Sequence, residues 1–138
     1  FEPGRAIIAN SAVLFTQIIY IKNTDKKKFI ILDAAMNDFM RPALYGSFHN
    51  IIPLLKKNKK SKKIHDFVGP ICETTDRFLS LKGFQNLKEK EFLAISDVGA
   101  YGMSLSSNYN LRPKPSEIMV NKKSIKLILK RQKLINFI

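Results

Sequence analysis

The side chains best suited to chemistry are a single cysteine and the carboxylate beside it, in the stretch GPICETTD at residues 69 to 76. Cys72 is the only cysteine of the chain, and Glu73 follows it directly. A lone cysteine is commonly a small buried hydrophobic residue. The thiol and the adjacent carboxylate could instead act together as a functional pair. The cysteine and its neighbours alone leave both interpretations open.

Arginine is the second informative residue type, because lysine is the usual cation of this sequence. Of the 24 basic residues, 19 are lysines and five are arginines. Where lysine is the default, an arginine suggests a need for a planar group that can hold a carboxylate or phosphate with two hydrogen bonds. An ordinary ion pair explains any single one of them equally well. The five are Arg5, Arg41, Arg77, Arg112 and Arg131.

The elements that must position these residues are mostly short strands. Residues 6–19 contain no Gly or Pro and carry apolar residues at helical spacing, which predicts a helix. The segment 39–55, bracketed by Pro42 and Pro53, has room for one or two helical turns. We expect strands at residues 27–36, 64–72 and 91–102, and a hairpin formed by 116–121 and 124–131. The pattern predicts a mainly β fold, a sandwich or barrel with one leading helix.

Composition limits the possible functions. A chain of 138 residues can build one domain with its own core. Its net charge of +13 invites a nucleic-acid interpretation, but the run KKNKKSKK at 56–63 and the lysines at 26–28 fall between apolar segments, without aromatic residues to stack on bases. We therefore expect no nucleic-acid partner. The alternative to an enzyme is a basic, non-catalytic module that acts through the 56–63 run.

The remaining signals concern location and metals. One cysteine cannot form an internal disulfide, which favours a reducing compartment. The sequence has no apolar run of membrane-spanning length and no signal-peptide pattern. We expect a cytoplasmic protein without a membrane partner, and a piece of a longer chain because Phe1 replaces an initiator Met. His49 and His65 have no partners at metal-binding spacing, so we expect no metal site and structural roles for both histidines.

Four segments occur in one order along the whole chain: EPGR (2–5), DAAMNDFMRPALYG (33–46), VGPICETTD (68–76) and DVGAYGMSLSSNYNLRPKPSEIMV (97–120). Together they resemble the C-terminal part of the diaminopimelate decarboxylases. The resemblance implies a pyridoxal 5'-phosphate enzyme of the alanine racemase-like fold that makes lysine from meso-diaminopimelate.

The family combines a (β/α)8 barrel, which holds the cofactor, with a β-rich C-terminal domain. On that pattern residues 1–27 would be the end of the barrel and the helix leading out of it, and residues 28–138 the β-rich domain. The barrel lysine that binds the cofactor is absent from this chain. The resemblance therefore implies that the 138-residue chain is inactive alone.

The resemblance also gives roles to individual residues. The EPGR turn, made of Glu2, Pro3, Gly4 and Arg5, would hold the cofactor phosphate, and Arg5 would also reach a substrate carboxylate. Arg41 and Tyr45 are four residues apart, so they would share one face of a helix and grip the substrate. Tyr101 in GAYG would contact both cofactor and substrate.

The same resemblance assigns the Cys-Glu pair. The family's cysteine protonates the α carbon after carbon dioxide has left, and its glutamate binds the distal amino group of the substrate. Cys72 would be the general acid and Glu73 the specificity residue, reaching into the barrel of the partner in a homodimer.

The chain departs from the family pattern at two adjacent positions. The family commonly has Ser-Gly where this chain has Thr74-Thr75. If that glycine has a positive φ, Thr75 would be strained and the Glu73 side chain would point in a different direction.

The second candidate function keeps the decarboxylation chemistry but changes the substrate, to ornithine, arginine or a carboxylated polyamine precursor. Arg5, Arg41 and Tyr45 favour a substrate with a second carboxylate.

Overall fold

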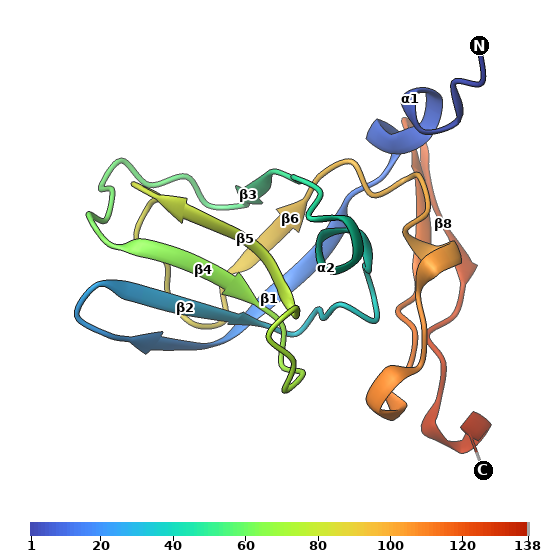
Figure 1. Ribbon diagram of the computed structural model, residues 1–138. Coiled ribbons are helices and arrows are strands. Elements are labelled where there is room, and N and C mark those ends of the chain that lie inside the picture. The colour runs from blue at the N-terminus through green and yellow to red at the C-terminus, as the bar shows by residue number, and fades with distance from the viewer. Residues whose placement is uncertain (138) are drawn as a thin grey trace.

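A computed structural model describes residues 1–137, which form a curled six-stranded sheet and a separate hairpin (Figure 1). The strand order in the sheet is β3-β6-β1-β2-β4-β5, and β7 pairs with β8 in the hairpin. Two five-residue helices, α1 (Gly4–Ile8) and α2 (Arg41–Tyr45), accompany the strands. The strands are β1 (Leu14–Asn23), β2 (Lys27–Leu32), β3 (Ile51–Pro53), β4 (Ile64–Val68), β5 (Arg77–Lys82), β6 (Phe92–Ile95), β7 (Glu117–Asn121) and β8 (Ser124–Leu129). The expected mainly β fold is confirmed.

One parallel pair determines the topology. Strands β2 and β4 run parallel, with Phe29 opposite Asp66, whereas every other pair in the sheet is antiparallel. Parallel neighbours cannot be joined by a tight hairpin. The connection from β2 to β4 therefore crosses over, and it carries both α2 and the edge strand β3.

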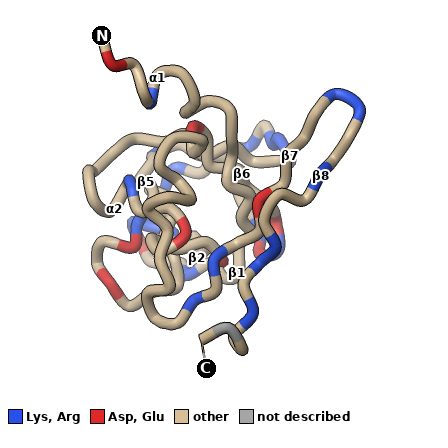
Figure 2. Tube along the Cα trace, turned by 90° about the vertical axis from the view of Figure 1, so that its right-hand side faces the viewer, with Lys and Arg blue, Asp and Glu red and all other residues tan. Residues whose placement is uncertain are grey.

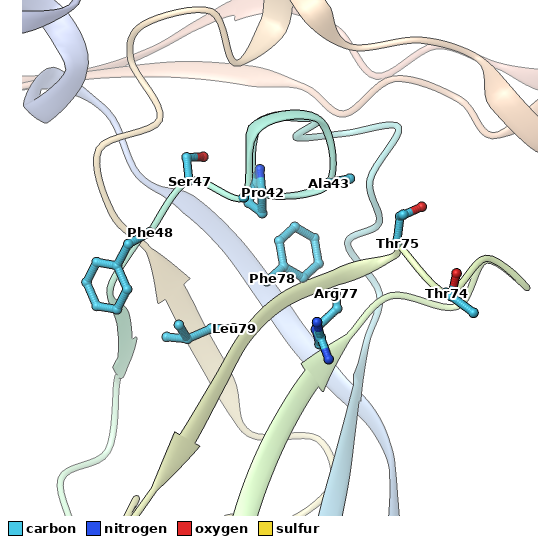
Figure 3. A pocket seen from close by; sticks show the side chains of 10 residues that line it. Pro42, Ala43, Ser47, Phe48, Thr74, Thr75, Arg77, Phe78 and Leu79 are labelled. Atoms are coloured by element: carbon cyan, nitrogen blue, oxygen red, sulfur yellow. The ribbon is translucent and has the colours of Figure 1, made fainter.

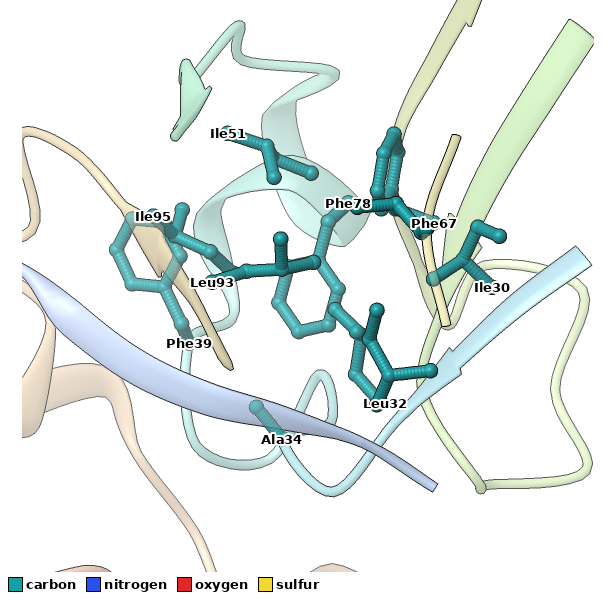
Figure 4. Close-up of a cluster of buried hydrophobic side chains, with 11 residues drawn as sticks. Ile30, Leu32, Ala34, Phe39, Ile51, Phe67, Phe78, Leu93 and Ile95 are labelled. Carbon is teal, nitrogen blue, oxygen red and sulfur yellow. The ribbon is translucent and has the colours of Figure 1, made fainter. Parts of the chain in front are cut away.

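The core lies inside the curl of the sheet. Side chains from most strands and from the crossover meet there (Figure 4). Strands β1 and β2 bury residues at alternate positions, as the pleat requires, whereas Leu93, Ala94 and Ile95 of β6 are all buried. The most deeply buried apolar side chains are Ile18, Ile30, Leu32, Phe39, Phe67, Leu93 and Ile95.

The predicted helix at residues 6–19 is wrong beyond its first turns. Helix α1 ends at Ile8, a short 3₁₀ turn covers Ala9–Ser11, and β1 begins at Leu14. The stretch VLFTQIIYI is rich in β-branched and aromatic residues, which favour strands. It fills a central place between β6 and β2, where pairing on both sides outweighs a weak helical periodicity. Residues 14–23 thus belong to the sheet, while the assignment of the residues before them to a barrel stays a prediction.

The other expected elements are present but shorter. Strand β2 covers the first six residues of the expected strand at 27–36, and β4 and β6 lie within 64–72 and 91–102. The expected hairpin is confirmed as β7 and β8. Strand β5 was not predicted, although the last four residues of its sequence RFLSLK alternate between apolar and polar.

The hairpin differs from the sheet in its burial. Every residue of β8 is exposed, and apolar side chains of both strands face solvent. Val120 and Ile125 are 75% and 78% exposed. The hairpin is therefore held together by the pairing of β7 with β8 and not by a hydrophobic core.

The lysine-rich segments do not form one binding face. Lys and Arg residues are spread over several loops and the hairpin (Figure 2). Lys27 and Lys28 lie in β2 and are half-buried, and the Lys27 ammonium is 2.9 Å from an Asp66 carboxylate oxygen. In the 56–63 run, Lys57 forms an ion pair with Glu91. This distribution does not favour a basic, non-catalytic module.

His65 is a buried ionisable residue within the aromatic part of the core. Its ring lies 6.3 Å from that of Phe67 and 5.9 Å from that of Phe84, measured between centroids. Within residues 1–137 neither ring nitrogen has a hydrogen-bond partner. Burial, followed by the nearby Lys28 charge, lowers the pKa of His65, with the Lys63 backbone acting in the opposite direction. The neutral imidazole is therefore the form that the fold accommodates.

We expect acid to weaken the sheet around His65, and a His65→Leu variant to resist this. Folding lowers the pKa of His65, so below the unfolded pKa of about 6.5 the unfolded chain binds a proton more readily than the folded chain does. The stability at this site is therefore complete above that pH, and it is lost as the pH falls toward the pKa of His65 in the folded protein. Burying an unpaired polar group also costs about 1–3 kcal/mol, so the variant should be more stable at pH 7. Hydrogen-exchange protection of β2 and β4 amides in the full-length protein, measured at pH 7 and pH 5, checks this. An equal loss of protection in both proteins would contradict it.

Candidate active site

One group of predicted site residues comes together around Arg41, and we call Arg5, Arg41, Tyr45 and Tyr101 the arginine cluster. The guanidinium carbon of Arg41 lies 5.3 Å from the ring centroid of Tyr45 and 5.8 Å from that of Tyr101. Both distances are typical of a cation over an aromatic face. Three segments far apart in the sequence, α1, α2 and the turn after β6, thus contribute to one site.

The sequence of α2 explains how Arg41 and Tyr45 share a face. Pro42, in the first turn, has no amide hydrogen to leave unsatisfied. Gly46 ends the helix with a φ of 60°, and its amide donates to the Pro42 carbonyl at 3.0 Å. Pro42 is buried against the rest of the fold. The expected one-turn spacing of Arg41 and Tyr45 is confirmed.

Tyr101 is held in a conformation that non-glycine residues rarely adopt. Its φ is 63°, and Asp97 in the same turn has a φ of 58°. The turn is fixed on the segment after α1 by hydrogen bonds from Val98 to the Ala12 carbonyl (3.2 Å) and from Gly99 to the Ala9 carbonyl (2.9 Å). Backbone conformations of this kind concentrate at functional sites, where surrounding contacts hold them in place.

The Tyr101 hydroxyl lies directly against the EPGR turn. A Cβ atom on Gly4 would be only 3.2 Å from this hydroxyl oxygen, so a side chain at position 4 would crowd Tyr101. Glu2, Pro3 and Gly4 are exposed, whereas Arg5 is half-buried. The Gly4 amide donates to the Glu2 carbonyl at 2.9 Å, so this amide is used within the turn.

The two arginines of the cluster carry unneutralised charge. Within residues 1–137, the Nε atoms of Arg5 and Arg41 are buried without hydrogen-bond partners, and neither arginine forms an ion pair. Their charges also reach His49, whose pKa is lowered mainly by burial and further by both arginines, against a hydrogen bond to the Ser96 carbonyl. Buried cationic donors without partners suit a ligand with carboxylate or phosphate groups.

Cys72 and Glu73 lie on a different part of the molecule, in the loop between β4 and β5. Cys72 is exposed, so its interpretation as a buried hydrophobic residue is wrong. Asp76 holds the loop in shape. Its carboxylate accepts hydrogen bonds from the amides of Ile71 (2.8 Å) and Met36 (2.7 Å), while burial raises its pKa.

Thr75 fits this loop without strain. The five non-glycine residues with positive φ among the described residues do not include Thr74 or Thr75. The Thr75 hydroxyl lies 3.7 Å from the sulfur of Met36. Replacement of the family's glycine therefore leaves the backbone in an ordinary conformation at this position.

Tyr109 and Arg112 are two residues near this loop whose roles were not predicted. The Tyr109 hydroxyl donates to Oε1 of Glu73 at 2.6 Å. Arg112 forms an ion pair with Asp38 at 3.5 Å and donates from Nε to the Asn37 side-chain oxygen at 2.9 Å. Both lie in the quoted segment 97–120, but only the tertiary contacts reveal what they bind.

The arginine cluster and the Cys72–Glu73 loop are separate within one chain. Helix α1 lies at the top of Figure 1, the β4–β5 loop at the bottom, and α2 between them. Helix α2, the β4–β5 loop and the start of β5 together line a shallow pocket of about 300 Å³, which includes Pro42, Ala43, Thr74, Thr75 and Arg77 (Figure 3). No hydrogen bond, ion pair or ring contact found among residues 1–137 joins the two groups.

Metal-binding clusters and membrane-spanning helices are both absent from residues 1–137. Residues 1–137 contain no group of three or more His, Cys, Asp or Glu side chains placed to hold a metal ion. None of the helices described is long and apolar enough to span a membrane.

This combination of a curled sheet and a Cys-Glu loop defines a class of protein. Residues 6–99 match the family described as pyridoxal-dependent decarboxylase, C-terminal sheet domain, and the chain belongs to this family. It is 47% identical over 132 residues to the diaminopimelate decarboxylase of Aquifex aeolicus, covering 95% of this chain and 31% of that protein. The chain thus spans about a third of the length of this relative.

Solved structures agree with the sequence comparison. The diaminopimelate decarboxylase of M. jannaschii in complex with L-lysine is 37% identical with a TM-score of 0.91, covering 96% of this chain and 30% of that one. The enzyme from Helicobacter pylori, also complexed with L-lysine, is 42% identical with a TM-score of 0.86, covering 96% and 32%.

Proposed function

We propose that this chain is the C-terminal domain of an enzyme that decarboxylates meso-2,6-diaminopimelate to L-lysine and carbon dioxide, using pyridoxal 5'-phosphate. The similarity to enzymes of that name over 95% of the chain supports this. The observation that carries the proposal is the pair of buried, unpaired Nε atoms of Arg5 and Arg41. Diaminopimelate has a carboxylate at each end, and ornithine and arginine have only one.

The residues present fit the cofactor. Gly4 leaves room beside the Tyr101 hydroxyl, and the Nε of Arg5 has no protein partner within the described residues. Glu2, Pro3, Gly4, Arg5 and Tyr101 would hold it, although the Gly4 amide would have to leave the Glu2 carbonyl to serve as a phosphate donor. Bound pyridoxal phosphate supplies a ring that accepts the negative charge left on the α carbon when carbon dioxide departs.

The remaining residues bind the substrate and move one proton. Arg41 and Tyr45 would grip a substrate carboxylate, together with Arg5, and Glu73 would accept hydrogen bonds from the distal ammonium group. The Cys72 thiol would transfer its proton to the α carbon, and the thiolate would then recover a proton from solvent.

We propose a homodimeric, cytoplasmic enzyme in which each active site combines groups from both subunits. The separation of the arginine cluster from the Cys72–Glu73 loop within one chain supports this arrangement. A site built from the arginine cluster of one subunit and the loop of its partner would contain every residue that the chemistry needs.

The experiment that tests the function compares substrates with the full-length enzyme. Carbon dioxide release is measured with meso-diaminopimelate, L-ornithine and L-arginine, each with added pyridoxal phosphate. We expect turnover of diaminopimelate alone. Turnover of ornithine or arginine at a similar kcat/KM would overturn the proposed substrate and favour the related decarboxylases.

Arg41→Lys in the full-length enzyme should lower kcat/KM for diaminopimelate by about 10- to 100-fold, equivalent to about 1.5–3 kcal/mol. The charge is kept, but an ammonium cannot form two parallel hydrogen bonds with a carboxylate. Steady-state kinetics measure the effect, and Arg77→Lys, a change at an exposed arginine on β5, is the matched control. Unchanged kinetics would remove Arg41 from the site.

A further inference from the structure

Glu73, although exposed, has a hydrogen-bond partner in a distant segment, the side chain of Tyr109. The Tyr109 hydroxyl donates to Oε1 of Glu73 at 2.6 Å, across 36 residues of sequence. The hydrogen bond to this carboxylate, together with its charge, raises the pKa of Tyr109. The phenol therefore stays protonated and continues to donate over the whole neutral range.

The turn that carries Tyr109 has an unfavourable backbone conformation. Asn110 and Leu111, the two residues after it, have φ angles of 55° and 54°. Consecutive non-glycine residues in this region are unusual, and surrounding contacts must hold them there. The Asn108 side chain donates to the Arg112 carbonyl at 2.9 Å and closes the turn. Arg112 in turn binds Asn37 and Asp38.

The loop that carries Glu73 is fixed to the same short segment. Asp76 accepts a hydrogen bond from the Met36 amide at 2.7 Å, next to the Asn37 and Asp38 side chains that bind Arg112. Ser107 also donates its amide to the Asn37 carbonyl at 2.9 Å. Residues 36–38 thus hold the Glu73 loop on one side and the Tyr109 turn on the other.

We propose that Tyr109 is a positioning residue for Glu73, which fixes one carboxylate oxygen so that the other accepts the distal ammonium group of the substrate. This inference rests on the proposed function of Glu73. A glutamate side chain has several rotamers, and binding a ligand with a freely rotating carboxylate costs conformational entropy. The hydrogen bond to Tyr109 restricts these rotamers before the ligand arrives.

The test uses Tyr109→Phe, Glu73→Gln and the double variant in the full-length enzyme. We expect Tyr109→Phe to raise KM for diaminopimelate about ten-fold while kcat changes less than about three-fold, the signature of lost binding and not lost chemistry. The double variant should be no worse than Glu73→Gln alone, because Tyr109 acts through Glu73. Tyr20→Phe, at an exposed tyrosine of β1, is the matched control and should leave KM unchanged.

A second readout separates this inference from the proposed function. The ionisation of Tyr109 is followed by the difference in phenolate absorbance between the wild-type protein and Tyr109→Phe. Glu73→Gln should lower the pH at which Tyr109 ionises, whether or not diaminopimelate is the substrate. Absence of turnover on diaminopimelate would overturn the function alone. An unchanged ionisation of Tyr109, or kinetic effects that multiply in the double variant, would overturn the positioning role.

Discussion

Replacing Cys72 by alanine in the full-length enzyme is expected to lower kcat about 10²- to 10⁴-fold, the usual contribution of a general acid. KM should change little, because the thiol is proposed to act after carbon dioxide has left. Cys72 is exposed and Asp76 holds the backbone of its loop, so the substitution should not disturb the fold. Steady-state carbon dioxide release, together with the amount of L-lysine formed, measures the effect.

A change at the same loop without the thiol provides the control. Thr75→Ala removes an exposed side chain three residues away and should alter kcat less than about three-fold. The solvent deuterium isotope effect should increase in Cys72→Ala, because proton delivery then limits turnover. If Cys72→Ala and Thr75→Ala have equal kcat values, Cys72 is not the proton donor.

Mixing two inactive variants should restore activity. We expect Cys72→Ala and Arg41→Ala subunits, combined in equal amounts and refolded together, to recover about a quarter of wild-type activity. Random pairing makes about half of the dimers mixed. Each mixed dimer has one site with an intact arginine cluster and an intact Cys72–Glu73 loop, and one site with both defects.

The control pairs two defects of the same loop. Cys72→Ala mixed with Glu73→Ala should recover nothing, because every site then receives one defective loop. Differently tagged subunits allow mixed dimers to be purified and counted before the assay. Purified mixed dimers of Cys72→Ala with Arg41→Ala that remain inactive would show that each site is built within one subunit. Failure to obtain any dimer would contradict the proposed homodimer.

Local sequence patterns predicted those parts of the site that depend on local structure. Arg41 and Tyr45 were expected on one helical face, since residues four apart meet on any α-helix, and the structure pairs them. The β7–β8 hairpin was recognisable from two apolar runs separated by Lys122-Lys123. These features need only short-range geometry.

Features that depend on tertiary pairing were not predictable in this way. Residues 14–19 suit a helix or a strand by periodicity, and their place between β6 and β2 decides for the strand. The contact between Tyr109 and Glu73 depends on residues 36–38, which anchor both segments from a third part of the sequence. A single sequence does not reveal such a three-way arrangement.

The β7–β8 hairpin has a consequence for how the chain behaves before it is assembled. Its apolar side chains face solvent, and an exposed strand pair with free edges is a template for joining other copies. In a newly made chain this segment would therefore favour association with other copies of the chain. Early coverage of its apolar side chains and free edges would limit this association.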